Sequence, residues 1–312
     1  MSTTDVVIVA YQSRDRMDTC LSPLLDLAGL GIVVVVDHGA DGAGLIAEEF
    51  GARVVEEPSN PGFGAGQNAG LRLCRGDYVL MCNPDAVINP DAIATGVHYL
   101  DRSPHVAAVQ GRILDARTAT VQRSAWLRVG PAFLWSRVLG ISRIRRSVTE
   151  LIATLPLASR EAQPSGHNQL RSSPVEALGA IALLCRRDAL DTVGGFDEGY
   201  FLYREDIDLC RRLREHGWEL RTLDLLWAVH EGGASSPDAR ERTRQWWKGT
   251  MRYAALWFTP LQWLSATCAA VVHCVCQITL GPATVAHSVQ EFIIEPVVLR
   301  RKHTRGSAYG TP

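Results

Sequence analysis

Residues 5–42 read DVVIVAYQSRDRMDTCLSPLLDLAGLGIVVVVDHGADG, and this stretch decides the fold class. It begins with an unbroken apolar, β-branched run at Val6–Ala10 and closes with a second one at Ile32–Val36. Between them, apolar residues at helical spacing predict a helix over Arg14–Ala28. Apolar strands without alternation are typical of parallel sheets, in which helices cover both faces. The pattern therefore predicts the β–α–β unit of an α/β protein.

The alternation of strands and helices continues along the chain. We expect further strands at Arg53–Glu56, Tyr78–Cys82, Val106–Gly111, Val175–Cys185 and Leu226–His230. We expect helices at Leu45–Phe50, Gly64–Cys74, Pro90–Leu100 and Glu205–His216. Right-handed crossovers join such strands into an open, doubly wound sheet. Ligands bind beyond the carboxyl ends of its strands, which directs attention to Tyr11, Asp37 and the segment after Cys82.

Composition excludes several classes of protein. Hydrophobic residues make up 46% of the 312 positions and charged residues 21%, which is ordinary for a globular chain. The net charge is −1, and the absence of a basic stripe argues against binding of nucleic acid. The eight cysteines form no CxxC pair, and the N-terminal residues lack the pattern of a signal peptide. We therefore expect a cytoplasmic protein.

The chain changes character near residue 237. We expect a sheet domain over residues 1–236, with a variable excursion over 112–174, and a mainly helical, apolar region over 237–312. Residues 253–290 contain no Asp, Glu, Lys or Arg, and basic residues close the chain at Arg300, Arg301, Lys302 and Arg305. Three interpretations of 254–290 stay open: an interfacial amphipathic helix, a helix packed on the sheet domain, or a single membrane span.

Two segments at the predicted ligand edge suit a nucleotide. Asp37 ends a strand, where its carboxylate can accept hydrogen bonds from a base or ribose; the alternative is a turn before Gly39. The segment NPGFGAGQNAG, residues 60–70, places glycines before a helix. Glycines allow close approach of a ligand to the backbone, and a helix start favours negative charge.

Two further residues suit a metal ion. Asp85, in VLMCNPDAVINPDAI (79–93), follows a buried strand by three residues. A lone carboxylate together with diphosphate oxygens suits a divalent cation, although an Asn-Pro-Asp turn is the alternative. Such an ion would neutralise a leaving diphosphate. His230 ends the strand in LLWAVHEGGASS (225–236), where it is either a metal ligand or an ordinary core or surface histidine.

The richest motif is GGFDEGYFLYREDIDLCRRLREHGW, residues 194–218. Its carboxylates Glu205, Asp206 and Asp208 crowd one helix start, which the helix dipole favours. Asp206 shares the inward face of the helix with Leu209, Cys210 and Leu213, whereas Asp208 projects elsewhere. An inward carboxylate can act as general base toward a hydroxyl, an effect of about 10²–10⁴ in rate. Glu205 is the rival candidate.

Taken in this order, the motifs resemble the family-two inverting glycosyltransferases of the GT-A fold. Within that family they resemble the bacterial rhamnosyltransferase branch, which builds cell-wall and surface polysaccharides. The resemblance covers residues 4–236, and it is carried by NPGFGAGQNAG, NPDAVI, the 194–218 motif and HEGGASS. It implies a GT-A type doubly wound, mostly parallel sheet.

The resemblance also implies roles for individual residues. Asp206 would be the catalytic base, and Asp85 with His230 would bind Mg²⁺ or Mn²⁺. The nucleotide-sugar donor would be bound by Ala10, Tyr11, Asp37, Gly64, Gln67, Asn68 and Asn83. The chain departs from the family after Asp37, with His38 in place of the usual Asn, and at Ala177, where the family often has Trp.

The implied reaction is a single displacement with inversion at the anomeric carbon of the sugar, and the resemblance to the rhamnosyltransferase branch implies rhamnose, from dTDP-rhamnose, as that sugar. The acceptor would be a lipid-linked or polysaccharide hydroxyl, reached from the inner face of the cytoplasmic membrane. Two alternatives belong to other classes of protein: a sugar nucleotidyltransferase, and a catalytically inactive nucleotide-sugar-binding scaffold in a membrane assembly.

Overall fold

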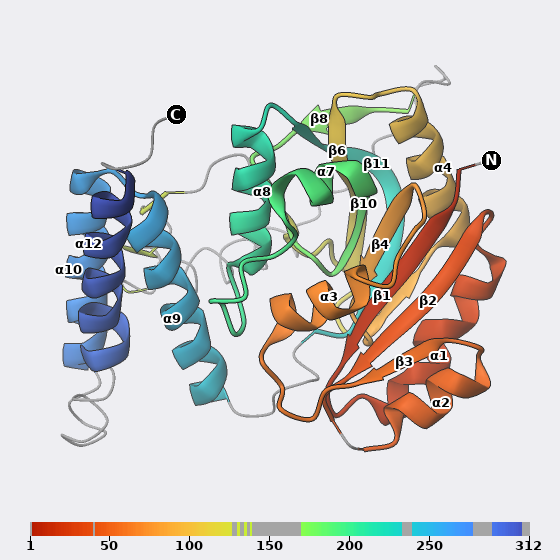
Figure 1. The fold of residues 1–312 in the computed structure, drawn as a ribbon, viewed down its shortest axis with the longest axis horizontal. Coiled ribbons are helices and arrows are strands. Elements are labelled where there is room, and N and C mark those ends of the chain that lie inside the picture. Colours follow the sequence, from red (N-terminus) through yellow and green to blue (C-terminus); the bar gives the residue numbers. More distant parts are fainter. Residues whose placement is uncertain are drawn as a thin grey trace, which may run out of the picture. The chain divides into compact units, whose positions relative to one another are not determined.

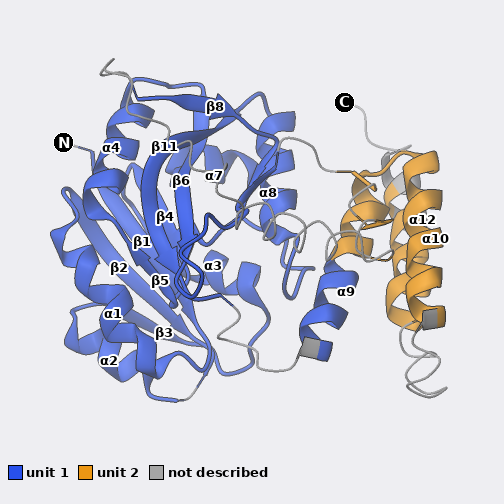
Figure 2. Ribbon diagram, turned by 180° about the vertical axis from the view of Figure 1, so that it is seen from behind, with its two compact units in different colours: residues 1–128, 170–249 blue, residues 129–169, 250–312 orange. Residues whose placement is uncertain are grey.

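The computed structural model describes residues 2–39, 41–126, 130–131, 134–135, 138, 170–232, 239–276 and 289–307. The chain divides into two compact units (Figure 2). The first unit comprises residues 1–128 and 170–249, and the second comprises residues 129–169 and 250–312. Most of the predicted excursion, and residues 277–288 of the apolar region, lie outside the described residues.

A nine-stranded sheet forms the centre of the first unit (Figure 1). Its order is β3-β2-β1-β4-β10-β6-β11-β5, and β8 pairs with β11. The strands are β1 (Thr4–Ala10), β2 (Leu30–Asp37), β3 (Arg53–Glu56), β4 (Tyr78–Cys82), β5 (Ala86–Ile88), β6 (Val106–Asp115), β8 (Ser172–Pro174), β10 (Ala182–Arg186) and β11 (Glu219–His230). Strands β1, β2, β3, β4, β6 and β11 share one direction, and β5, β8 and β10 oppose it. The predicted α/β class with a mostly parallel sheet is confirmed.

Helices cover both faces of this sheet, as the continuous apolar strands predicted. In β1, Val6 and Ile8 face a core that includes residues of α1 (Met17–Leu21), α2 (Ala43–Glu49) and α4 (Pro90–Asp101). Val7 and Val9 point to the other face, where they meet Gly70 and Gly66 of α3 (Phe63–Leu71). The helices α7 (Arg187–Val193) and α8 (Glu205–Glu215) lie on the same face as α3 (Figure 1). Alternate residues of one strand thus serve two cores.

Three predicted elements differ most in the structure; smaller differences are that β6 continues to Asp115 rather than Gly111 and that α3 ends at Leu71 rather than Cys74. The helix expected over Arg14–Ala28 is α1 flanked by 3₁₀ turns at Arg14–Arg16 and Ser22–Asp26, because Pro23 cannot donate a backbone hydrogen bond to a continuing α-helix. The strand expected over Val175–Cys185 is broken: β9 (Ala177–Leu178) pairs with β7 (Ala125–Trp126), and β10 enters the main sheet antiparallel. Strand β11 begins at Glu219 rather than Leu226, because register shifts after Thr222 hide its alternation.

The described part of the second unit is helical. Helix α9 (Ala239–Trp257) begins in the first unit and ends in the second, which also contains α10 (Pro260–Cys276) and α12 (Glu295–Ser307). Arg300 of α12 caps the end of α9 by donating hydrogen bonds to three backbone carbonyls, those of Ala254, Ala255 and Phe258. None of the described helices is long and apolar enough to cross a membrane. The described residues of the predicted C-terminal region, 239–276 and 289–307, are mainly helical, but residues 239–249 belong to the first unit rather than to the second.

Candidate active site

Strand pairing brings Asp85 and His230 together. Asp85 lies in the turn between β4 and β5, and β5 pairs with the end of β11, where Ala86 is the register partner of His230. His230 Nε2 lies 3.0 Å from Asp85 Oδ1, and both side chains are buried. Asn83 Nδ2 lies 3.5 Å from the same ring nitrogen. Two residues 145 positions apart therefore share one sheet edge, at the carboxyl ends of β4 and β11.

Gln122 determines which ring nitrogen of His230 carries hydrogen. The amide nitrogen of Gln122 lies 3.1 Å from Asp115 Oδ2 and 3.2 Å from the His230 carbonyl, and both of these oxygens must accept. Its amide oxygen therefore faces His230 Nδ1, at 2.8 Å, and accepts a hydrogen bond from it. This arrangement turns Nε2 toward Asp85: Nε2 donates to Oδ1 when both ring nitrogens are protonated, and its lone pair is available to a metal ion once that proton is lost. A histidine held in this way is typical of metal sites, in which the second nitrogen is fixed by a polar neighbour.

The pair has the donor set of a divalent cation site that shares its ion with a ligand. Two ligand atoms about 2.1 Å from one ion and at right angles lie about 3.0 Å apart, which is the Asp85–His230 spacing. Burial tends to raise the pKa of Asp85, but the hydrogen bond and charge of His230 outweigh it and hold that pKa below its usual value. Within the described ranges, no group of three or more His, Cys, Asp or Glu side chains could hold a metal ion. The other coordination positions of such an ion would be filled by diphosphate oxygens and water.

Asp206 reaches the same region from α8. It is the second residue of that helix, it is half-buried, and its Oδ1 accepts a hydrogen bond from Ile207 N at 2.7 Å. Its other oxygen faces the break between β9 and β10: a Cβ added to Gly179 would lie 3.5 Å from Oδ2. Burial raises the pKa of Asp206, and backbone hydrogen bonds from Ile207 and Ala180 oppose the rise.

The break between β9 and β10 connects Asp206 with the Asp85–His230 pair. Ile181 O accepts a hydrogen bond from Asn83 N at 2.8 Å, so residues 179–181 run between the carboxylate of Asp206 and the turn of Asp85. Gln110, which is fully buried, donates to Gly179 O at 2.7 Å and supports this segment. The stretch between β9 and β10, which interrupts the predicted strand, therefore lies at the candidate site.

Glu205, the rival candidate for the base, is buried at the start of α8. Burial, and secondarily the charge of Asp206, raise its pKa to about 8, so the carboxyl is neutral at pH 7. Its Oε2 has no hydrogen-bond partner in the described structure. The charge of the neighbouring Asp206 carboxylate disfavours ionisation of Glu205 because like charges repel one another. Glu205 therefore keeps its proton at pH 7 and adds no negative charge beside Asp206.

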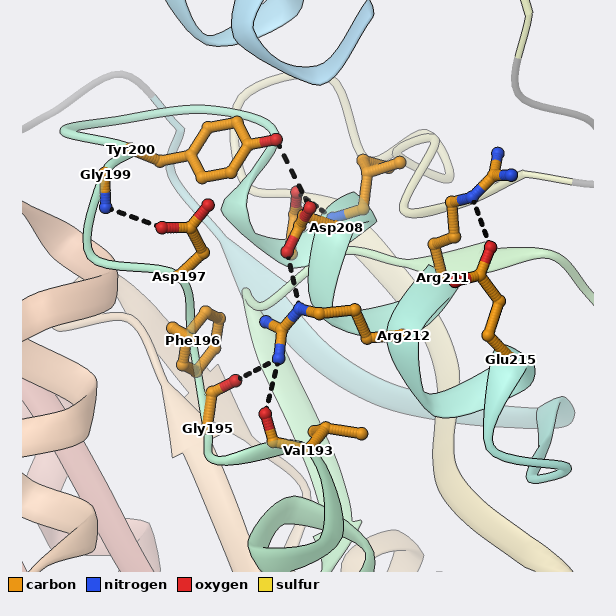
Figure 3. A network of polar contacts seen from close by, with 12 residues as sticks. Val193, Gly195, Phe196, Asp197, Gly199, Tyr200, Asp208, Arg211, Arg212 and Glu215 are labelled. Atoms are coloured by element: carbon orange, nitrogen blue, oxygen red, sulfur yellow. Dashed lines mark hydrogen bonds and ion pairs between the residues drawn. The ribbon is translucent and has the colours of Figure 1, made fainter. Parts of the chain in front are cut away.

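Asp208 is a structural residue. It projects away from Asp206, as predicted, but it is 1% exposed and forms an ion pair of 2.7 Å with Arg212 (Figure 3). Arg212 also donates to the carbonyls of Val193 and Gly195, each at 2.8 Å, and Tyr200 Oη lies 3.3 Å from Asp208 Oδ1. This network ties α8 to the 193–200 loop. The sequence did not predict this network. Acidic residues at the start of α8 and basic residues near its end are also what the helix dipole favours, so their positions did not indicate an ion pair.

The predicted nucleoside end of the site lies at β1 and β2. Ala10 is buried, whereas Tyr11 is 37% exposed beyond the strand end. Both carboxylate oxygens of Asp37 accept backbone hydrogen bonds, from Gly39 N at 2.8 Å and from Gly44 N at 2.9 Å. Asp37 thus forms the turn that we considered as the alternative, and one lone pair on each oxygen is left for a ligand.

The glycine segment packs against the loop before α8. A Cβ on Gly64 would lie 3.1 Å from the Cβ of Phe196. Asn68 donates to Phe196 O at 2.9 Å and accepts from Phe196 N at 2.8 Å, so its amide bridges the two segments. Gln67 is fully buried, and neither atom of its amide has a partner in the part of the chain that the structure describes. A buried amide of this kind normally forms hydrogen bonds with a ligand or an ordered water molecule.

Sequence reasoning missed Gln122 and Gln110. Both lie in or beside the predicted excursion, and no motif marks them. Gln122 hydrogen-bonds the ring of His230, and Gln110 hydrogen-bonds the backbone of Gly179. Both contacts join segments far apart in the sequence, so they become visible only once the pairing of β6 with its neighbours is known.

Comparisons with known proteins agree with this architecture. The chain is 27% identical over 285 residues to the N-acetylglucosaminyl-diphospho-decaprenol L-rhamnosyltransferase of Mycobacterium tuberculosis, which covers 83% of this chain and 87% of the relative. It is 26% identical over 183 residues to the rhamnosyltransferase WbbL of Escherichia coli K12, which covers 57% of this chain and 62% of the relative.

A solved structure with the same fold is the mannosyltransferase PcManGT from Pyrobaculum calidifontis in complex with GDP-Man and Mn2+. Its TM-score is 0.53 at 14% identity, over 97% of this chain and 83% of that one. The fold is therefore that of the GT-A glycosyltransferases. Residues 3–250 match the family model described as "Glycosyltransferase like family 2", so the chain belongs to glycosyltransferase family 2.

Proposed function

We propose that the chain is a metal-dependent, inverting transferase that moves a sugar from a nucleotide-diphosphate donor to an acceptor hydroxyl. The observation that supports this most is a line that runs from His230 and Asp85, past Asn83 and the segment 179–181, to the carboxylate of Asp206, which accepts a backbone hydrogen bond from Ala180. That line gives one sheet edge a cation-binding pair and a base. Transfer from a sugar diphosphate needs both.

Asp85 and His230 would hold Mg²⁺ or Mn²⁺ at the donor diphosphate. When bound, the ion withdraws negative charge from the leaving diphosphate. The nucleotide sugar would further contact Ala10, Tyr11, Asp37, Gly64, Gln67, Asn68 and Asn83. The likeness to two rhamnosyltransferases supports rhamnose, from dTDP-rhamnose, as the transferred sugar.

In the proposed step, Asp206 accepts the proton of the acceptor hydroxyl while the hydroxyl oxygen attacks the anomeric carbon. The bond from that carbon to the diphosphate oxygen breaks, and the nucleoside diphosphate leaves with the electron pair. Attack from the face opposite the leaving group inverts the anomeric configuration. Glu205 is neutral at pH 7, so it does not compete with Asp206 for the proton of the acceptor hydroxyl.

We further propose that the acceptor is lipid-linked or a polysaccharide of the cell wall or surface, and that the enzyme works on the inner face of the cytoplasmic membrane.

Helix α10 supports the proposed contact with a membrane. Its outward face carries the large apolar side chains Leu261, Leu264, Val271, Val272 and Val275, which are 37–80% exposed. Its inward face carries small residues, which are Ala266, Ala269, Ala270 and Cys274. A helix with its larger apolar residues outward favours a lipid surface, and the basic residues after position 299 favour anionic lipids.

The double variant Leu261→Glu/Leu264→Glu is expected to lose binding to vesicles that contain phosphatidylglycerol, because two carboxylates on the apolar face oppose insertion and are repelled by the lipid. Sedimentation with the vesicles measures this. Leu45→Glu is the matched control, since Leu45 is 66% exposed on α2. Equal sedimentation of the double variant and the unmodified chain would refute the membrane contact.

The transferase proposal is tested by incubating the full chain with a panel of nucleotide sugars, without acceptor, and measuring release of nucleoside diphosphate. Slow release that requires Mg²⁺ or Mn²⁺ and stops with EDTA is expected for the correct donor. Absence of release from every donor would identify an inactive scaffold. Release of pyrophosphate from a nucleoside triphosphate and a sugar phosphate would identify a nucleotidyltransferase.

A further inference from the structure

The loop that precedes α8, residues 201–204, has an unusual backbone. Tyr203 has a φ of 69° and Arg204 a φ of 79°, so two consecutive residues with side chains are left-handed. This conformation brings Cβ close to a carbonyl oxygen and costs free energy at each residue. It persists where surrounding structure imposes it, and it is concentrated at functional sites. The contacts of this loop therefore identify what imposes it.

One face of α9 contacts both left-handed residues. Gly249 lies against the backbone of Tyr203: a Cβ at Gly249 would overlap the Tyr203 carbonyl oxygen and would lie 3.1 Å from the carbonyl oxygen of Leu202. Trp246 is three residues earlier, on the same face of the helix. Its ring centroid lies 5.2 Å from the guanidinium carbon of Arg204, a cation–π contact. These residues belong to the part of α9 within the first unit (Figure 2).

The glycine segment holds the other end of the loop. Phe63 N donates to Phe201 O at 2.9 Å, and a Cβ at Gly62 would overlap the same carbonyl oxygen. The loop is therefore fixed at its first residue by the glycine segment and at its last two residues by α9.

The loop sets the start of α8 and with it the direction of Asp206. Arg204 is the N-cap of α8, and its carbonyl accepts the hydrogen bond of Asp208 N at 2.9 Å. Asp206 follows two residues later, with its carboxylate against Gly179. A change in the backbone angles of Tyr203 or Arg204 turns the first residues of α8 and moves the carboxylate away from residues 179–180.

We propose that Gly249 and Trp246 are positioning residues, which hold Tyr203 and Arg204 in the left-handed conformation and so aim the Asp206 carboxylate. The inference rests on the proposed role of Asp206 as base. Neither residue of α9 takes part in the chemical step. They act through the loop, so their loss lowers turnover and leaves donor binding in place.

Gly249→Ala tests this. The new Cβ displaces the Tyr203 carbonyl, and a base moved by about 1 Å lowers kcat on the order of 10²-fold. The Kd for uridine or thymidine diphosphate, measured by calorimetry with Mn²⁺, is expected to change by less than about threefold, since ground-state binding is untouched. Gly51→Ala is the matched control: Gly51 has a φ of 78° and no neighbour within 4 Å, so alanine there strains a turn away from the site.

Trp246→Leu and Trp246→Phe give a second test, which can be used even if the Gly249→Ala variant folds poorly. Leucine removes the ring face under Arg204 and is expected to lower kcat, whereas phenylalanine keeps a ring and restores most of it. A kcat of Gly249→Ala equal to that of Gly51→Ala, or equal losses of kcat and nucleotide affinity, would overturn the inference. Asp206→Asn is measured beside them. If it retains transfer, the proposed base is wrong, whatever Gly249→Ala does.

Discussion

Asp206→Asn is expected to lower sugar transfer by about 10²–10⁴-fold and to leave nucleoside diphosphate binding intact. Asparagine has nearly the shape of aspartate, and its side-chain oxygen still accepts the hydrogen bond from Ile207 N. It cannot take a proton from the acceptor hydroxyl. Initial rates with a labelled donor measure transfer, and calorimetry with the nucleoside diphosphate measures binding. Loss of both together would indicate a structural defect rather than a lost base.

Glu205→Gln is the matched control, because it makes the same change one residue earlier. The pKa of Glu205 is about 8, so at pH 7 the amide replaces a neutral carboxyl and most of the transfer is expected to remain. Above pH 8 the unmodified chain ionises Glu205 and places a second charge beside Asp206. The variant lacks this charge, so its pH–rate profile is expected to lack the inflection near pH 8. Retained turnover in Asp206→Asn with loss in Glu205→Gln would assign the base to Glu205.

Arg212→Met is expected to destabilise the first unit by about 3–5 kcal/mol, because it leaves the carboxylate of Asp208 buried without its ion pair. Asp208 is 1% exposed, and Arg212 also supplies hydrogen bonds to the Val193 and Gly195 carbonyls (Figure 3). Methionine keeps the length of the side chain and removes its charge and donors. Urea denaturation with tryptophan fluorescence measures the free energy of unfolding.

Arg211→Met is the control for this loss. Arg211 is the neighbouring arginine of α8 and forms an i,i+4 pair of 3.0 Å with Glu215 on the solvent side, where both side chains are at least one-third exposed. An exposed pair of this kind contributes about 0.3–0.5 kcal/mol. Equal destabilisation by the two variants would show that the Asp208–Arg212 network does not hold α8 against the 193–200 loop.

The elements that were predicted within a residue or two are those whose apolar pattern is local. Strands β3 and β4 have the predicted bounds. Helix α4 has the predicted start, where the Asn89 side chain accepts a hydrogen bond from Ala92 N, and it exceeds its predicted end by one residue. The pairing of Asp85 with His230 follows from the position of both at strand ends. Their 3.0 Å separation depends on β5, a three-residue strand too short for a periodic pattern.

The remainder of the site depends on long-range pairing. In the sequence, residues 179–181 look like the middle of one apolar strand. In the structure they separate β9 from β10, and they hydrogen-bond Asn83 and Gln110. The left-handed backbone of Tyr203 and Arg204 could not be predicted either, because glycine or asparagine usually occupies positions with a positive φ. Local preference is overruled there by contacts with segments more than 40 residues away.

The central claim is that Asp85 and His230 bind one cation together with the donor diphosphate. Crystals grown with thymidine diphosphate and Mn²⁺ test it through the anomalous scattering of manganese. We expect one peak about 2.0–2.3 Å from Asp85 Oδ1 and from His230 Nε2, in contact with the diphosphate oxygens. A manganese peak at the diphosphate that touches neither side chain would contradict the account.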